Sequence, residues 1–205
     1  MSTTLIIIIV TCIVSIPAFS NPSRMYAWMF NPYQIVYRKQ YYRMITSGFL
    51  HADYVHLIFN MLTLYFFGDA VEYYFNQLTN YGTFLYVGLY LSAIVVSDIP
   101  SLLKHKENPN YNALGASGAV SAVVFSSILF NPMTDLCLYG LLCLPGFIFG
   151  AIYVIYSYYQ GKRQGDNVNH DAHLFGALYG VLITIAIWPG VIMHFIEQLR
   201  TFSLF

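Results

Sequence analysis

Ser117 lies between glycines in the stretch GASG, at the beginning of an apolar run. A single hydroxyl group in such a run has few possible roles. Serine is a weak nucleophile unless a nearby base takes its proton. Histidine is the usual base, and His173 lies near the start of another apolar run, HLFGALYG. Together the two residue types indicate acyl transfer. The alternative is that the small residues around Ser117 only allow two helices to pack closely.

Three more polar residues lie in the stretch HADYVHLIFN, where His51, His56 and Asn60 begin an otherwise apolar segment. His56 and Asn60 are four residues apart, so on a helix they share one face. Each costs free energy if it is left unpaired in hydrocarbon. Side-chain donors of this kind can stabilise the oxyanion that forms during acyl transfer. The alternative is a pair of hydrogen bonds between helices with no catalytic role.

The composition places these residues in a membrane protein. Of 205 residues, 58% are hydrophobic and 9% are charged, whereas soluble domains are about 25% charged. A net charge of zero, without a basic cluster, argues against a nucleic-acid partner. A bilayer core of about 30 Å needs roughly 20 apolar residues of helix. Six such stretches predict an all-α bundle of six membrane-spanning helices in one domain, residues 1–205: about 3–20, 54–71, 79–97, 113–130, 136–156 and 170–188.

The direction of the predicted spans brings the polar residues together. Consecutive spans run in opposite directions, so the second, fourth and sixth begin at the same membrane face. His56, Asn60, Ser117 and His173 all lie near the beginnings of these spans. If the fourth span begins at residue 113, a rise of about 1.5 Å per residue places Ser117 about 6 Å below its start. We therefore expect one polar site, within reach of water, near one face of the membrane.

Small residues predict which spans touch. Gly176 and Gly180 have the GxxxG spacing that permits close contact between helices. The fourth span offers a matching smooth face that includes Gly115 and Gly118. Packing of these two spans would bring the His173 ring beside the Ser117 hydroxyl, at the same depth. A packing seam alone does not require that pair, so the combination favours a catalytic site.

These residues resemble the motifs of the rhomboid intramembrane serine proteases over nearly the whole chain. The matching stretches are HADYVHLIFN, FGDAVE with Gly68 and Glu72, GASG with Ser117, and HLFGALYG with His173. Their order and spacing agree with the family. The resemblance implies a fold of six spans and a serine endopeptidase without cofactor or metal.

The resemblance also implies roles for individual residues. Ser117 and His173 would form a catalytic dyad without a third carboxylate. His56, Asn60 and the Ser117 backbone N–H would form the oxyanion hole. His51 would support the site. The implied partners are transmembrane protein substrates, cut near the membrane surface, and the lipid bilayer.

The sequence departs from the family pattern at two places. A Trp-Arg pair of the first loop appears here as Tyr42-Arg43. Many members carry an aromatic residue four positions after the serine, stacked on the catalytic histidine, whereas this chain has Ser121. Another residue must therefore orient His173.

The orientation in the membrane is predicted differently by two lines of reasoning. The resemblance implies a multi-pass protein of the cell (inner) membrane, with cytoplasmic termini and an active site that opens outward. The loops on that outer face, 21–53, 98–112 and 157–169, hold eight of the nine Lys and Arg residues. Cytoplasmic loops normally carry this excess. We follow the family for the expected orientation.

The sequence also allows other functions and predicts two further features. Four histidines near one face, two of them His51 and His170, raise the alternative of a metalloprotease, although no HExxH motif supports it. A rhomboid-like binding protein without catalysis is the second alternative. Pro145-Gly146 is expected to kink the fifth span, and the three cysteines are expected to act as small apolar side chains.

Overall fold

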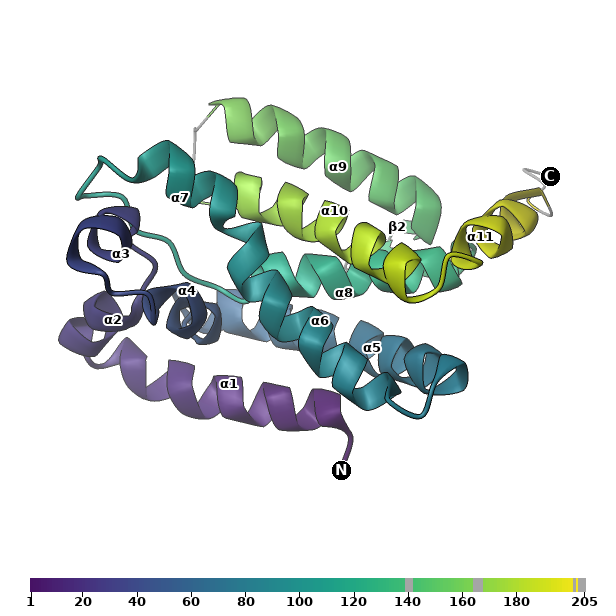
Figure 1. The fold of residues 1–205 in the computed structure, drawn as a ribbon, viewed down its shortest axis with the longest axis horizontal. Helices are drawn as coiled ribbons and strands as arrows, with labels where there is room; N and C mark the ends of the chain where they lie inside the picture. Colours follow the sequence, from purple (N-terminus) through teal and green to yellow (C-terminus); the bar gives the residue numbers. More distant parts are fainter. Residues whose placement is uncertain (139–141, 164–167, 201, 203–205) are drawn as a thin grey trace.

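The computed structural model describes the whole chain except residues 139–141, 164–167, 201 and 203–205. The described residues form a mostly helical bundle with one two-stranded hairpin (Figure 1). The elements in chain order are α1 (Thr3–Phe19), α2 (Pro22–Trp28), α3 (Pro32–Arg38), α4 (Arg43–Thr46), a 3-10 turn (Ser47–Phe49), α5 (Tyr54–Leu78), α6 (Gly82–Ser97), α7 (Ile99–His105), α8 (Ser117–Phe130), β1 (Asp135–Leu138), β2 (Leu142–Pro145), α9 (Gly146–Arg163), α10 (His170–Ile187) and α11 (Val191–Arg200).

Three stretches of helix in the described residues are long and apolar enough to cross a membrane. They are α5, the stretch Gly82–His105 that contains α6 and α7, and α10. The helices α1 and α8 are also apolar but shorter. Large apolar side chains on α5, among them Ile58, Leu62 and Phe66, are exposed on the outside of the bundle. Such a surface suits lipid rather than water, so the chain is an integral membrane protein.

The helix that carries Ser117, α8, lies at the centre of the bundle between α5, α6 and α10 (Figure 1). Every residue from Gly118 to Ile128 is buried. The helix has 14 residues, or about 21 Å at the usual helical rise, which is less than the roughly 30 Å of a bilayer core. A membrane crossing at this position would therefore need the non-helical segment before α8 as well.

The backbone of that segment, residues 112–116, is hydrogen-bonded to the folded loop between α1 and α5. Ala113 and Phe30 exchange two backbone hydrogen bonds of 3.0 and 2.9 Å, and the Gly115 N–H donates to the Ser47 carbonyl at 3.0 Å. Irregular backbone at membrane depth is stable only when such groups are satisfied within the protein. The loop between α1 and α5 thus supports the chain that leads into Ser117.

Arg43 holds this loop together. Its guanidinium group is buried and donates to the backbone carbonyls of Tyr26 and Met29 at 2.8 and 2.9 Å, and to the Gln40 side chain at 2.6 Å. The Tyr42 hydroxyl donates to a backbone carbonyl of α2 at 3.3 Å. The Tyr42-Arg43 pair therefore anchors the loop, although its first residue differs from the family pattern.

The predicted fifth span, 136–156, is wrong at residues 136–138 and 142–145, and its residues 139–141 lie outside the described residues. Residues 135–138 and 142–145 are the antiparallel strands β1 and β2, and the helix begins only at Gly146. Pro145 is the last residue of β2, so the Pro145-Gly146 pair starts a helix rather than kinking one. An apolar run of this length is compatible with either structure, and the prediction joined hairpin and helix into one span.

The prediction for the cysteines is wrong for two of the three. Cys137 and Cys143 face each other across the hairpin and form a disulfide, whereas Cys12 is free. The hairpin follows the C-terminal end of α8, and Ser117 lies at the N-terminal end. The disulfide and Ser117 are therefore at opposite faces of the bundle.

Candidate active site

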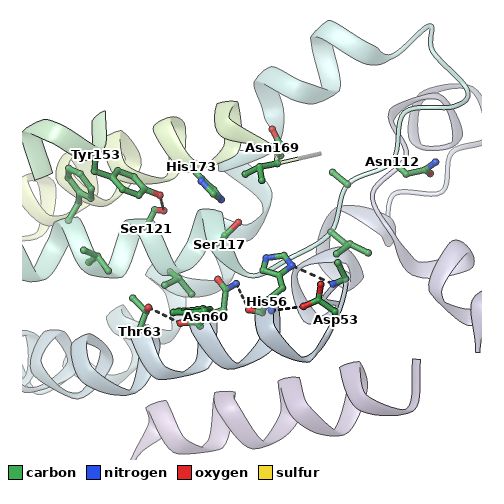
Figure 2. Close-up of a pocket in the computed structure, with 18 of the residues that line it drawn as sticks. Asp53, His56, Asn60, Thr63, Asn112, Ser117, Ser121, Tyr153, Asn169 and His173 are labelled. Atoms are coloured by element: carbon green, nitrogen blue, oxygen red, sulfur yellow. Dashed lines mark hydrogen bonds between the residues drawn. The ribbon is translucent and has the colours of Figure 1, made fainter. Parts of the chain in front are cut away.

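A cavity of about 660 Å³ opens beside the first turn of α8 (Figure 2). Ser117, His173, His56 and Asn60, predicted from four separate positions in the sequence, all line it. The cavity continues past apolar residues of α8 and lies between α5 on one side and α9 on the other. Among its lining residues are Phe59, Thr63, Val124, Phe125 and Phe149.

Ser117 is the first residue of α8, so the expectation of a helix that starts near residue 113 is wrong. The first intrahelical hydrogen bond runs from the Val120 N–H to the Ala116 carbonyl at 2.9 Å. No side chain caps this helix. The N–H groups of the first turn have no carbonyl partner within the helix and point toward the end at which the Ser117 hydroxyl lies. This is the arrangement that stabilises a negative oxygen.

Gly115 explains both the late start of α8 and the open space before it. Its φ angle is +126°, a backbone conformation open in practice only to glycine. A Cβ atom at this position would lie 2.9 Å from His56 Cε1 and 3.7 Å from Ser117 Oγ. Gly115 therefore faces His56 on α5, and the prediction that it belongs to the face of α8 that meets α10 is wrong.

His173 lies in the first turn of α10, and its imidazole points toward the Ser117 hydroxyl in Figure 2. Asn169 caps this helix, because its side chain accepts from the Ala172 N–H at 3.1 Å. The Asn169 amide also donates to Asp98 at 3.0 Å and accepts from Ser101 at 2.8 Å, which fixes the start of α10 against α6 and α7.

Asp171 is two residues before His173 in the sequence, and its side chain contacts α7. Its carboxylate forms a salt bridge with Lys104 of α7, with 2.9 Å between Nζ and Oδ2. The side chain therefore leaves the helix on a different side from His173. The dyad without a third carboxylate stays a prediction.

The hydrogen bonds of His56 indicate which ring nitrogen carries the proton. Asp53 caps α5 by accepting from the His56 N–H at 2.7 Å. The Ala52 N–H donates to His56 Nδ1 at 3.4 Å, so Nδ1 acts as an acceptor and the neutral ring carries its proton on Nε2. Nε2 is the atom near Gly115, where a Cβ would lie 3.1 Å away.

Asn60 lies one turn after His56 on the same face. Its amide nitrogen donates to the His56 backbone carbonyl at 2.9 Å, and the side chain is buried apart from its edge on the cavity. An amide nitrogen carries two protons. One is used within the helix, which leaves one for an acceptor in the cavity.

His51 lies behind His56 and does not line the cavity. It is fully buried, its Nδ1 lies 3.3 Å from the Ser15 hydroxyl of α1, and its ring packs edge-on against His56 with 5.0 Å between centroids. Burial, and secondarily the nearby His56, lower the pKa of His51 to about 3. The neutral His51 ring packs against His56, and its supporting role in the site stays a prediction.

The predicted contact of the fourth and sixth spans is present as the packing of α8 on α10. A Cβ at Gly176 would overlap the Gly118 carbonyl oxygen, and a Cβ at Gly180 would overlap the Ala122 carbonyl oxygen. Gly118 itself faces Ser97 of α6, with the Ala172 carbonyl 3.3 Å from where its Cβ would lie. The backbones of α8 and α10 therefore touch directly beside Ser117.

One residue at the site had no counterpart in the sequence-based prediction. Tyr153 of α9 lines the cavity, its hydroxyl lies 2.6 Å from the Ser121 hydroxyl, and its ring lies alongside that of His173. Tyr153 is 36 residues after Ser117 in the sequence, and α9 begins later than predicted. No local spacing could have linked the two residues.

The metal alternative receives no support from the described part of the chain. Among the described residues, no group of three or more His, Cys, Asp or Glu side chains is placed to hold a metal ion. His51 and His56 stack edge to face with each other, and His51 lies outside the cavity.

Comparison with known proteins identifies the family. Residues 38–190 match the model of the Rhomboid domain. The chain belongs to the rhomboid family. It is 26% identical over 162 residues to the mitochondrial RHOMBOID-like protein 12 of Arabidopsis thaliana, and 32% identical over 158 residues to the chloroplastic Rhomboid-like protein 11 of the same plant. These matches cover 72% and 70% of this chain.

A bacterial relative is similar to a comparable degree. It is YdcA of Bacillus subtilis (strain 168), which is named provisionally as a rhomboid protease and is 28% identical over 153 residues, or 71% of this chain and 66% of YdcA. The chain spans about half the length of the two plant relatives, at 46% and 51%. The rhomboid proteins are a membrane protease family.

Proposed function

We propose that this rhomboid protein is an intramembrane serine endopeptidase that cleaves transmembrane protein substrates near the membrane surface. The observation that carries the proposal is the meeting of Ser117 and His173, from α8 and α10, in one cavity beside two side-chain donors of α5. A packing seam between α8 and α10 requires neither a histidine nor the donors. The same residues match the family motifs.

In the proposed reaction, Ser117 Oγ attacks the substrate carbonyl carbon while His173 accepts the hydroxyl proton. The carbonyl oxygen becomes an oxyanion, which accepts hydrogen bonds from His56 Nε2–H, Asn60 and the Ser117 backbone N–H. His173 then gives its proton to the departing amine, and the peptide C–N bond breaks. Water, deprotonated by His173, hydrolyses the acyl-enzyme and restores the Ser117 hydroxyl.

The shape of the cavity supports a membrane substrate. Its apolar part extends between α5 and α9 and is lined by Phe59, Phe125 and Phe149, whereas its other end is lined by polar residues such as Asn112 and Asn169. A substrate that passes from lipid into water has the same change of polarity along its length. We propose that the apolar part of the substrate enters between α5 and α9, while the scissile bond lies at Ser117.

The proposal includes six membrane crossings, formed by α1, α5, α6 with α7, α8, α9 and α10. Three of these stretches are long and apolar enough by themselves, and α1 and α8 are apolar but shorter. α9 has 18 residues with Lys162 and Arg163 at its last turn, where long basic side chains can reach the membrane surface. Cysteine accessibility on both sides of a vesicle would test this topology.

The orientation with cytoplasmic termini and an outward-facing active site stays a prediction. One observation from the fold argues against it. An outward-facing active site with cytoplasmic termini would put the Cys137–Cys143 disulfide at the cytoplasmic face, yet disulfides persist mainly in oxidising compartments. The excess of Lys and Arg at the active-site face points in the same direction as the disulfide. The two plant relatives are named for mitochondria and chloroplasts.

A topology reporter decides between the orientations. One reporter is inserted directly after Arg163, in the predicted loop 157–169, and another is fused after Phe205. The family-based prediction requires the loop to be extracytoplasmic and the C-terminus cytoplasmic. The opposite pattern would place the cut at the cytoplasmic face and leave the proposed dyad unchanged.

The activity itself is tested with purified protein in proteoliposomes and a panel of single-span substrates. The wild type should cleave at least one substrate, whereas Ser117→Ala and His173→Ala should each lose nearly all activity, because residues that act as a unit fail together. Cleavage by Ser117→Ala at the wild-type rate would exclude the serine mechanism. Substrate binding without cleavage by the wild type would favour the alternative of a rhomboid-like binding protein.

A further inference from the structure

Tyr153 connects the helix on one side of the cavity with the proposed catalytic base. Its ring lies alongside the His173 imidazole, with 6.2 Å between centroids and 24° between planes. Its hydroxyl lies 2.6 Å from the hydroxyl of Ser121 on α8. Figure 2 shows the Tyr153 hydroxyl directed at Ser121, with the His173 ring close by.

The Tyr153 ring is fixed at this place by its neighbours. Phe125 of α8 lies 5.6 Å away between centroids and Phe149, one turn earlier on α9, lies 6.3 Å away. Contacts of this range between aromatic rings are attractive in tilted and offset geometries. The hydrogen bond to Ser121 adds a directional restraint, so the ring has little freedom to leave its position.

His173 has an aromatic neighbour on a second side. The ring of His170 packs edge to face against it, with 5.8 Å between centroids and 80° between planes. Tyr153 and His170 therefore border the imidazole from two directions, and both limit its rotation about the bond to Cβ. Such rotation matters because only one ring orientation directs a nitrogen at Ser117 Oγ.

We infer that Tyr153 is a positioning residue, which holds the His173 imidazole toward Ser117 and is itself anchored by Ser121. The inference rests on the proposed function, since it assigns a partner to the proposed base. Tyr153 occupies α9, one of the two helices that border the apolar part of the cavity, whereas Ser121 occupies the buried α8. A displacement of α9 away from α8 would break the Tyr153–Ser121 hydrogen bond and remove the ring from His173.

The test separates the ring of Tyr153 from its hydroxyl. Tyr153→Leu removes the ring, Tyr153→Met replaces it with a flexible side chain of similar length, and Tyr153→Phe keeps it. The matched control is Tyr159→Leu, because Tyr159 is on the same helix and is 61% exposed on its outer side. For each variant, kcat and KM for a single-span substrate are measured, together with the rate of covalent labelling of Ser117 by a small fluorophosphonate.

Tyr153→Leu and Tyr153→Met should lower kcat and the labelling rate about tenfold, which corresponds to about 1.4 kcal/mol in the barrier, with KM changed less than twofold. Tyr153→Phe should restore most of the rate, and Tyr159→Leu should match the wild type. Ser121→Ala should resemble Tyr153→Phe, and the double variant should be no slower than either single one, because both remove the same hydrogen bond.

Wild-type labelling rates in folded Tyr153→Leu or Tyr153→Met would overturn the inference, as would a loss confined to KM. These outcomes differ from failure of the proposed function. In that case Ser117→Ala would still cleave, or the wild type would show neither labelling nor cleavage. If Ser117 is essential and Tyr153 is not, only the positioning role is wrong.

Discussion

The close contact of α8 and α10 should make Gly176 intolerant of a single methyl group. In Gly176→Ala the new Cβ would overlap the Gly118 carbonyl oxygen and lie 2.8 Å from the carbonyl carbon. The carbonyl belongs to backbone and cannot rotate aside, so α10 must move from α8 by on the order of 1 Å. A displacement of this size can cost roughly 100-fold in rate when chemistry depends on alignment.

Gly180→Ala is the matched control. Its Cβ would meet the Ala122 backbone in the same way, with 2.6 Å to Ala122 Cα, but one turn farther from Ser117 and His173. Overpacking of either kind should reduce the free energy of unfolding by about 1–3 kcal/mol. We therefore expect similar losses of stability for the two variants, and a larger loss of kcat for Gly176→Ala.

The assay combines thermal unfolding in detergent with kcat for a single-span substrate. Two results would refute the reasoning. If Gly176→Ala were as stable and as active as the wild type, the backbones would not be in contact. If both variants lost kcat equally, the seam would matter only for overall folding and not for the position of His173.

Three further predictions concern Asn60, Gly115 and His51. Asn60→Ala should lower turnover by about 100-fold to 1000-fold, the usual cost of an oxyanion donor, as measured by kcat; an unchanged kcat would remove Asn60 from the site. Gly115→Ala should be less stable by about 1–3 kcal/mol because of the positive φ at this position, and it should lose turnover because the methyl group displaces His56. The control is Ala116→Gly, which adds no atoms. A fully stable Gly115→Ala enzyme would contradict the backbone argument. The low pKa of His51, about 3, means that the folded chain keeps this residue neutral while the unfolded chain binds a proton below about pH 6.5. The contribution of His51 to the free energy of unfolding should therefore be fully present above pH 6.5 and fall by up to about 1.4 kcal/mol per pH unit between pH 6.5 and 3. The free energy of unfolding of His51→Gln should depend less steeply on pH. Identical pH dependence of the variant and the wild type would show that His51 is not buried as a neutral group.

The grouping of the candidate residues in one cavity could largely be predicted from the sequence, because helix direction and helix spacing determine it. Alternation of the spans was enough to bring Ser117, His173 and His56 to one face, and the spacing of Gly176 and Gly180 predicted the helix pair that joins them. These are local rules that depend on the chain's own periodicity.

The parts that were mispredicted depend on particular backbone geometry or on distant contacts. The φ angle of Gly115 moves the start of α8 to Ser117, and sequence alone gives glycine several possible reasons. The strands at 135–138 and 142–145 are as apolar as a helix, and only the pairing of Cys137 with Cys143 distinguishes them. Tyr153 reaches His173 from another helix, so the side chain that replaces the expected aromatic neighbour could be found only in three dimensions.

The central claim is that Ser117 is a nucleophile activated by His173. The most direct measurement is the intact mass of the purified protein after treatment with a fluorophosphonate, followed by peptide mapping of the modified residue. We predict a single adduct on Ser117 in the wild type, formed far more slowly in His173→Ala and absent in Ser117→Ala. An unmodified wild-type protein that still cleaves substrate, or an adduct on Ser117 that forms equally fast without His173, would contradict the proposed mechanism.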